Sequence, residues 1–324
     1  MNEEFFTGVL GDPREDPRVQ AGYSIDEILA ASAPFDWRKK KDSELTRFPV
    51  WNQAQSSACV AFAKAKQVSI RVFLETGVWI DFSPSSIYQL RNNKPALGME
   101  IANANEIVNK RGVTLEALMK SQNMSEAQIN AVKRSRVADL VAQAIAEAVV
   151  SYLYVPVNID RIAQTIQAGK AVSLLTFGTN AEYARKKPVV IESNLQYAGA
   201  PVRHEIVSME YYIDAQGDKV IHIEDSAHFG GFHERDFTEE WLAKRVILAD
   251  AIDLFTFEPG TGDKPRYDGT IISVQKCLRY EGLFPADVDY VESYGPVTKK
   301  GVRDFQVKHG LHPTGVDNIG PATQ

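Results

Sequence analysis

The sequence predicts an α+β chain with a helical lobe, an antiparallel β lobe and a small all-helical domain at the end. Segments with helical spacing of apolar residues dominate before residue 150, and apolar strand-like runs follow from residue 171. A stretch rich in proline, glycine and charge, EPGTGDKPRYDGT at 258–270, separates both from the last part of the chain. Helices first and strands later favour two lobes over an alternating parallel sheet.

The 324 residues are expected to form four parts, whose bounds follow from the composition of the linker and from the resemblances described below. These are an N-terminal extension over 1–34, a two-lobed domain over 35–257, a linker over 258–267 and a helical domain over 268–324. The extension holds one helical candidate, Ser24–Ser32, and we expect it to lie on the surface of the following domain.

Helices are expected first, at Ser57–Thr76, from Pro84 with Ser83 as its cap, at Ile101–Lys110 and at Ser125–Val150. The first ends at Gly77, a typical stop, and its apolar residues share one face. The last is expected to be one long, alanine-rich helix capped by Ser125.

The β lobe is expected to begin with a short helix at Ile159–Ala168. Strands are then predicted at Ala171–Phe177, Glu205–Ile213, Lys219–Glu224, Trp241–Ile247 and Asp253–Phe257. In the last domain, helices are expected at Ile271–Tyr280 and Thr298–His309.

Charge and composition exclude several classes of function. The net charge of -6 argues against a nucleic-acid partner, because phosphate binding needs a basic face. The sequence contains no run of about 18 apolar residues, so we expect no membrane insertion. The start, MNEEFFTGVLGDPREDPR, lacks the features of a secretory signal peptide, so we expect synthesis in the cytoplasm.

The two cysteines, Cys59 and Cys277, fall in different predicted domains, so no disulfide framework is expected. No cysteine–histidine cluster has zinc-like spacing, and we expect neither a metal nor another cofactor.

Cys59 lies in the stretch PVWNQAQSSACVAF at 49–62, in the first turn of the predicted helix. Amides at a helix N-terminus lower the pKa of a thiol, which favours a nucleophile. A buried core cysteine is the structural alternative, since free cysteine is among the most buried residue types. Gln53 favours the nucleophile, because its amide and the Cys59 N–H can form an oxyanion hole.

The stretch resembles the papain-like cysteine peptidases, in which P-V-x-N-Q-G-x-C-G-S-C-W-A-F carries the oxyanion glutamine and the nucleophile. The positions that coincide without a gap are Pro49, Val50, Asn52, Gln53, Cys59, Ala61 and Phe62. Phe35-Asp36-Trp37-Arg38 is similar to the family's entry to the mature domain. Ser56 replaces a cysteine that the family pairs in a disulfide, and Val60 replaces its tryptophan.

The resemblance implies a general base roughly 130–150 residues after the cysteine, and His204 lies in that interval at the start of a strand. Asp225 follows the next strand, where the family has an asparagine, and an aspartate can accept the Nδ1–H of His204. Ala227 stands where a tryptophan of the family shields this pair from water. Phe229 and His228 are the candidates to replace it.

The mechanism that the resemblance implies is acyl transfer on a peptide or protein substrate. Cys59 attacks the carbonyl, Gln53 and the Cys59 N–H hold the oxyanion, His204 protonates the leaving amine, and Asp225 orients the ring. The paired-glycine wall of the family's groove has only Gly98 as a counterpart.

Other titratable residues receive structural interpretations. His222 is expected to pack on its strand, His228 and His233 to lie in a loop, and Glu205 to be a surface or strand-pair residue.

Residues 268–324 resemble the small peptidoglycan-binding domain of cell-wall hydrolases. The matching positions are Val274-Gln275, Leu278, Gly282, Gly295-Pro296-Val297-Thr298, Val302, Phe305-Gln306, Gly310-Leu311, Pro313-Thr314-Gly315-Val316 and Ile319-Gly320-Pro321-Ala322-Thr323. These are mostly core and turn positions, so a docking module without glycan affinity is the alternative. Cys277 is expected in its core.

The sequence therefore predicts a cysteine hydrolase that cuts peptide bonds and binds peptidoglycan, acting at the bacterial cell wall or in a phage particle. The alternative is a catalytically weak or inactive papain-like assembly protein, such as a virion component with virion partners, that binds the wall. Val60 and Ala227 favour the alternative, whereas the set Gln53, Cys59, His204 and Asp225 opposes it.

Overall fold

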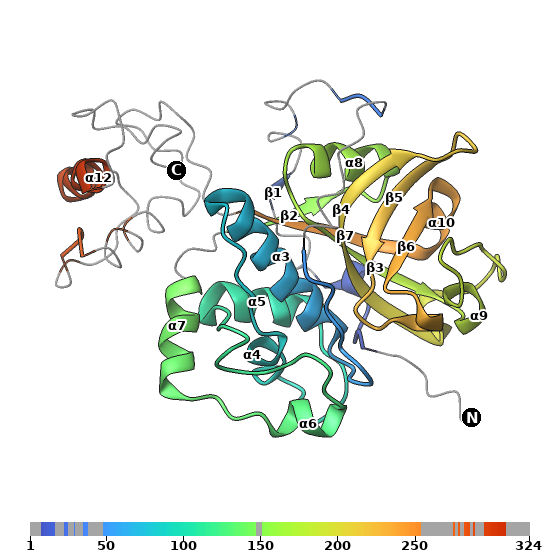
Figure 1. Cartoon of the computed structure of the whole chain (residues 1–324), viewed down its shortest axis with the longest axis horizontal. Coiled ribbons are helices and arrows are strands. Elements are labelled where there is room, and N and C mark those ends of the chain that lie inside the picture. The colour runs from blue at the N-terminus through green and yellow to red at the C-terminus, as the bar shows by residue number, and fades with distance from the viewer. Residues whose placement is uncertain are drawn as a thin grey trace.

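The computed structural model describes residues 8–16, 23–24, 29, 35–37, 48–146 and 151–253, and then 275, 278, 282–285, 288 and 295–308. The helices within 59–146 gather on one side, and the seven-stranded sheet, whose first strand is Tyr23–Ser24, lies on the other (Figure 1). This is the mixed helical and antiparallel architecture that the order of elements predicts.

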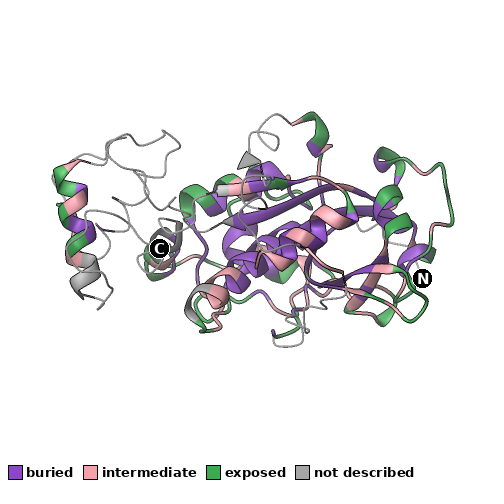
Figure 2. Ribbon diagram, turned by 90° about the horizontal axis from the view of Figure 1, so that it is seen from above, coloured by how far each residue is buried: buried purple, intermediate pink, exposed green. Residues whose placement is uncertain are grey.

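The helical lobe consists of α3 (Cys59–Thr76), α4 (Pro84–Tyr88), α5 (Ile101–Arg111), α6 (Glu126–Ala131) and α7 (Arg136–Ala146). Helix α3 contacts α4 and α5 on one side and strand β4 (Val202–Ile213) on the other. It is therefore buried along its first three turns (Figure 2). As predicted, α3 ends at Gly77, with φ 71°, and Ser83 caps α4 by accepting from the Ser86 N–H.

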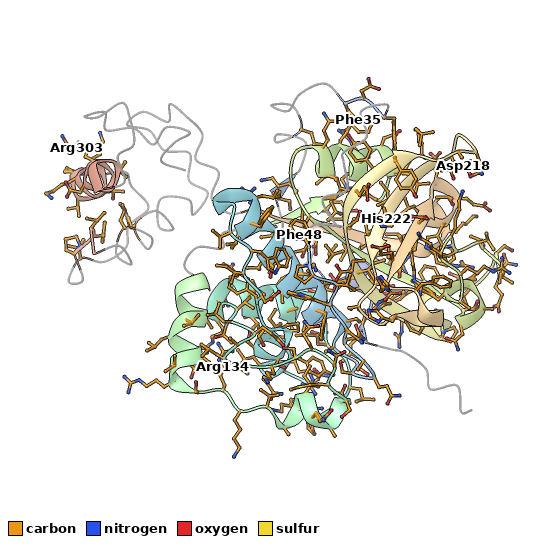
Figure 3. The ribbon with its side chains drawn as sticks, in the orientation of Figure 1. Phe35, Phe48, Arg134, Asp218, His222 and Arg303 are labelled. Atoms are coloured by element: carbon orange, nitrogen blue, oxygen red, sulfur yellow. The ribbon has the colours of Figure 1, made fainter. Side chains whose placement is uncertain are left out.

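The single helix predicted over Ser125–Val150 is wrong. Ser125 does cap a helix, but α6 ends where Val132 turns to an extended conformation. Helix α7 then starts afresh, because the Ser135 hydroxyl accepts from the Ala138 N–H at 3.2 Å. Between the two helices, Arg134 donates to the Ser86 carbonyl at 2.8 Å and fixes the break (Figure 3). Residues 147–150 lie outside the described residues.

The sheet has the order β1-β2-β7-β3-β4-β5-β6. Its remaining strands are β1 (Tyr23–Ser24), β2 (Ser151–Val155), β3 (Val172–Gly178), β5 (Lys219–Glu224), β6 (Glu234–Thr238) and β7 (Val246–Asp253). All neighbouring strands are antiparallel except β1 and β2. The strands predicted at β3, β4 and β5 are confirmed, and β4 begins at Val202. Helix α8 (Ile159–Gln167), capped by Asn158, packs on this sheet, as predicted.

The strand predicted over Trp241–Ile247 is wrong, because most of it is helix α10 (Glu239–Arg245). The Thr238 hydroxyl caps this helix, acids occupy its first turn and bases its last, and each arrangement favours a helix. Of the strand predicted at Asp253–Phe257, only Asp253 is described, and it ends β7. Of the helical candidate Ser24–Ser32, Ser24 pairs in β1, and only Leu29 among the rest is described.

Two large apolar clusters form the core. One surrounds α3 and reaches β3 and β7, and the other lies between the sheet, α8 and α10. Because α3 contributes to a cluster that also includes strand residues, the lobes share packing at their junction. Among the described helices, none is long and apolar enough to cross a membrane.

In the C-terminal part, α12 (Pro296–Lys308) confirms the second predicted helix, and Figure 3 labels Arg303 on it. The Gln275 amide donates to the Thr298 hydroxyl at 2.9 Å, and both side chains are buried. Gly301 packs so closely that an added Cβ would lie 2.8 Å from Leu278 Cδ1. These contacts join positions that the sequence pattern assigns to a core; Cys277 lies outside the described residues.

Candidate active site

Cys59 is the first residue of α3, as the sequence predicts. Its N-cap, Ala58, makes no side-chain hydrogen bond to the first turn, so no carboxylate or hydroxyl of the cap competes for those amides. The thiol is free of disulfides and fully buried. The sulfur therefore lies at the positive end of the helix dipole.

Gln53 is tied to the opposite lobe by a reciprocal contact with Ser226. The Gln53 N–H donates to the Ser226 carbonyl at 2.9 Å, and the Ser226 hydroxyl donates to Gln53 Oε1 at 2.8 Å. Because Oε1 is held by that hydroxyl, the amide nitrogen is directed the other way, where Nε2 donates to the Ser56 carbonyl at 2.8 Å. The loop before α3 is thereby fixed against the residue that follows Asp225.

His204 and Asp225 are paired, with 2.7 Å between Nε2 and Oδ1, and both side chains are fully buried. The prediction that Asp225 meets Nδ1 is wrong. The register of β4 and β5 pairs Val207 with Glu224, so Asp225 lies diagonally from His204 and meets the far nitrogen of its ring. Among the described residues, Nδ1 is buried without a hydrogen-bond partner.

The electrostatics of the pair favour an imidazolium. Burial disfavours the charged ring, but the Asp225 carboxylate and the nearby Cys59 thiol outweigh it and raise the pKa of His204 to about 10. Burial also opposes ionisation of Asp225, yet the charges of His204 and Arg235 lower its pKa to about 2. His204 thus interacts directly with both Cys59 and Asp225, which come from distant segments.

Phe229 covers the histidine ring. Its ring meets that of His204 edge to face, with centroids 5.7 Å apart, and the Tyr183 ring lies against Phe229 at a tilt of 49°, with centroids 5.5 Å apart. Of the two candidates to replace the family's tryptophan, Phe229 is therefore the one on the ring. His228 instead has its ring 5.4 Å from that of His233, within the same loop.

Arg235 is a residue that the sequence analysis missed. Its Nε donates to Asp225 Oδ2 at 2.6 Å, and its side chain is fully buried. The available signal was its place in ERDFT, a short alternating strand directly after the loop that Asp225 begins. An arginine at the buried position of such a strand needs an anion, and Asp225 is the acid nearest in the hairpin.

The N-terminal extension enters the site, rather than only lying on the surface as expected. Val9 pairs with Met99 in a parallel bridge, in which Met99 N–H donates to the Gly8 carbonyl at 3.0 Å and Leu10 N–H to the Met99 carbonyl at 3.1 Å. Gly8 lies against the thiol, since an added Cβ there would be 2.4 Å from Cys59 Sγ. The Tyr197 hydroxyl holds the next turn by donating to the Gly11 carbonyl at 3.0 Å.

The segment is attached to Met99 through the Gly8 carbonyl, which accepts from the Met99 N–H. It also closes the site: Val9, Cys59 and His204 all have zero exposure. Met99, whose backbone pairs with the segment, directly follows Gly98, the residue expected to contribute to the groove wall.

Glu205 is not a surface residue. It pairs with Leu175 across the strands, as one alternative predicts, but it is buried 2.9 Å from Lys64, which also binds Asp250 at 2.6 Å. Burial raises the pKa of Glu205. His222 packs within the sheet and binds Asp236 at 2.6 Å (Figure 3). In the described part of the chain, no group of three or more His, Cys, Asp or Glu side chains is arranged to hold a metal ion.

Solved cysteine protease structures share this architecture. Xylellain, a cysteine protease from Xylella fastidiosa, superposes with a TM-score of 0.59 and 15% identity, over 78% of this chain and 97% of its own. A procathepsin B from Trypanosoma congolense has a TM-score of 0.58 and 11% identity, covering 77% and 87%. A digestive procathepsin L 3 from Tenebrio molitor has 0.51 and 12%, covering 75% and 86%.

The C-terminal part matches a family model, described as a putative peptidoglycan binding domain, over residues 268–323. No curated protein matches the sequence. The chain therefore combines the fold of the papain-like cysteine proteases with a C-terminal segment that matches the peptidoglycan-binding family.

Proposed function

We propose that the chain is a cysteine peptidase that works through Cys59, His204 and Asp225 and is held at the bacterial cell wall by residues 268–324. Cys59 would attack a peptide carbonyl as a thiolate, while His204 would supply the proton to the leaving amine and then activate water. Asp225 would hold the imidazolium. Each step needs only groups within this site, together with water.

One observation supports this proposal above the others: a thiol at a helix N-terminus adjoins a buried His204–Asp225 pair. The raised pKa of His204 keeps its ring charged near neutral pH, which stabilises a neighbouring thiolate. A cysteine that only fills the core would not require a buried His204–Asp225 pair beside it.

Gln53 is proposed as the oxyanion donor. Its Nε2 carries two hydrogens, of which one is given to Ser56, so the amide has another to offer an incoming oxygen. The Cys59 N–H, in the first turn of α3, is the second donor. A tetrahedral oxyanion would then form between two groups that the Gln53–Ser226 contact holds in place.

The match at residues 268–323 supports peptidoglycan as a partner, and the substrate would be a protein or a peptide cross-link at the wall. Release by cell lysis or carriage in a phage particle would bring the chain to that surface.

The test is hydrolysis of fluorescent casein and of purified cell walls by the full chain and by Gly8→Val, which disturbs the segment over the thiol. Each is compared with the same chain carrying Cys59→Ala or His204→Ala. Cleavage that Cys59→Ala abolishes supports the proposal. Cleavage that survives Cys59→Ala contradicts it.

A second candidate is a wall-binding assembly protein, such as a virion component, that keeps the fold without turnover. The full burial of Cys59 beneath Gly8 favours it. Absence of cleavage by both the unchanged chain and the Gly8→Val variant, with Cys59 labelled no faster than an ordinary thiol, would select this candidate.

The wall-binding part is tested separately by sedimenting the full chain with purified cell walls. A chain lacking residues 259–324 should stay in the supernatant, because the matched family model lies within the deleted part. Equal sedimentation of both chains would remove the targeting proposal and leave the peptidase proposal intact.

A further inference from the structure

The buried guanidinium of Arg235 has every donor occupied. A guanidinium has five N–H groups. Here Nε donates to Asp225 Oδ2, Nη1 to the carbonyls of Tyr183 and Arg185, and Nη2 to those of Phe229 and Phe232. Asp225 is the one carboxylate that Arg235 meets within the described residues. The side chain therefore makes one ionic contact and four contacts to main chain.

Asp225 stands between two cations. Its Oδ1 meets His204 Nε2 at 2.7 Å and accepts from the Ala227 N–H at 2.9 Å, while its Oδ2 accepts from Arg235. If His204 were its only partner, deprotonation of the ring would leave a buried, unpaired carboxylate, which is costly. Arg235 supplies a permanent positive charge, so Asp225 stays balanced in both states of the ring.

The four carbonyls that Arg235 binds come from two segments that pack together beside His204. Tyr183 ends α9 (Asn180–Tyr183), and Phe229 begins the turn Phe229–Gly231. Gly230, with φ 60°, lies so close to the residue after α9 that an added Cβ would be 2.9 Å from Ala184 Cα. Because Phe229 lies on the His204 ring, the bonds of Arg235 to this turn also fix the cover of the ring.

We propose that Arg235 is the positioning residue of the site: its guanidinium balances Asp225 and fixes the turn that lays Phe229 on His204. Its consequence for catalysis rests on the proposed peptidase function, but its effect on the ring does not. Arg235 offsets part of the charge that Asp225 presents to the ring, so the pKa of His204 is raised less than an unpaired Asp225 carboxylate would raise it.

Among the described residues, Asp225 and Cys59 are the charged or titratable groups that act on the ring itself. Cys59 faces it from α3, Asp225 from the end of β5 and Arg235 from β6. Tyr183 of α9 contacts Arg235, and burial raises its pKa, so it stays neutral. The next residue along β4, Glu205, pairs with Lys64, which also binds Asp250. Arg235 is therefore the cation whose removal changes the balance at Asp225.

The test is a pH titration of the His204 ring by NMR in the full chain labelled at histidine Cε1, with the signal assigned by its loss in His204→Gln. The variants are Asp225→Asn, Asp225→Asn with Arg235→Gln, and Asp225→Asn with Arg235→Lys. In Asp225→Asn an unpaired guanidinium remains beside the ring and should hold the midpoint of His204 below that of the unchanged chain, since Cys59 is the same in both. Arg235→Gln should raise that midpoint by about one unit, and Arg235→Lys, which keeps the charge, should leave it low.

Arg245 provides a matched control. It is equally buried and binds Glu182 at 2.8 Å instead of Asp225, so Arg245→Gln in the Asp225→Asn chain should not move the midpoint. Equal midpoints in all the variants would overturn the proposal, and so would a rise with Arg235→Lys as large as with Arg235→Gln. If the chain with Arg235→Gln does not fold, the Arg235→Lys variant decides alone: a midpoint equal to that of Asp225→Asn supports the charge role, and a midpoint about one unit higher overturns it.

The second half of the proposal has its own readout. In otherwise unchanged protein, Arg235→Lys removes the Nη2 donors that bind the Phe229 and Phe232 carbonyls. The intensity of the nuclear Overhauser contact between Phe229 and His204 should therefore be lost or halved. Retention at full strength would show that the turn needs no guanidinium. Neither measurement requires turnover, so failure of the peptidase proposal would leave both results interpretable.

Discussion

Gly8 lies directly against Cys59: a Cβ at Gly8 would be 2.4 Å from the sulfur. A contact this short leaves room only for glycine. The backbone around it is bound to Met99 on both sides of Val9, so the segment is held over the thiol by main-chain hydrogen bonds and not by chance packing. If Cys59 is the nucleophile, as proposed, a substrate carbonyl would compete with residue 8 for the same space.

Gly8→Val should therefore open the site. Overpacking of this kind costs about 1–3 kcal/mol, which would increase the fraction of open chains by roughly 5- to 150-fold. The rate of Cys59 alkylation by iodoacetamide, followed by mass spectrometry, should rise by a similar factor.

Glu15→Ala is the matched control, because Glu15 belongs to the same segment but is exposed. Its alkylation rate should stay that of the unchanged chain. An unchanged alkylation rate in Gly8→Val would show that the Cys59 side chain moves to accommodate the valine while the segment stays in place.

The His204–Asp225 pair predicts how stability depends on pH. The folded-state pKa of His204 is raised to about 10 from 6.5, so the folded state binds a proton that the unfolded state releases. The stabilisation is fully present below pH 6.5 and is lost as the pH rises through 10. The melting temperature should fall across this interval, measured by circular dichroism.

His204→Gln should flatten that decline, because the titrating ring is absent. On the acid side, the lowered pKa of Asp225, about 2, gives stabilisation that is present above 3.8 and lost as the pH falls toward 2. Parallel melting curves for His204→Gln and the unchanged chain from pH 6.5 to 10 would refute the paired, charged state.

Much of this site could be predicted from local sequence, but its partners across the sheet could not. Cys59 and Gln53 lie in one continuous stretch, and His204 opens an apolar strand. The choice of Nε2 for Asp225 depends on the β4–β5 register, which no single segment specifies. Arg235 likewise becomes visible only when β6 is placed beside β5.

Two element predictions failed because local capping outweighed the apolar pattern. Ser135 starts a new helix within an alanine-rich run, and Thr238 starts α10, which covers most of the strand predicted over Trp241–Ile247. The contact between Gly8 and Cys59 could not be predicted from the sequence for another reason. Nothing in TGVLGD distinguishes a glycine that lies beside a sulfur distant in the chain.

Phe229→Ala should lower the pKa of His204. Removal of the ring admits water to the His204–Asp225 bond, and a higher local dielectric weakens the attraction that raises this pKa. We expect the NMR midpoint to fall by about one unit, toward the ordinary value. Phe229→Leu keeps an apolar cover and should move it less; equal shifts in both variants would mean that ring shape, not water exclusion, controls the pair.

Lys64 tests the charge cluster beneath the site. It is fully buried between Glu205 and Asp250, at 2.9 and 2.6 Å, and its loss would leave two acids facing each other in the core. Lys64→Met should lower the free energy of unfolding by about 3–5 kcal/mol, measured by urea denaturation with tryptophan fluorescence. Lys110→Met, at an exposed pair with Glu106, should change it by less than about 1 kcal/mol.

The loss in Lys64→Met should depend on pH in a defined direction. Burial already raises the pKa of Glu205, and without Lys64 that pKa rises further, so folding favours its protonated form. The deficit should therefore shrink as the pH falls and grow as it rises. Asp250→Asn added to Lys64→Met removes one of the facing acids and should recover part of the stability at pH 7. A double variant no more stable than Lys64→Met would show that lost packing of the lysine stem, and not unpaired charge, is the cause.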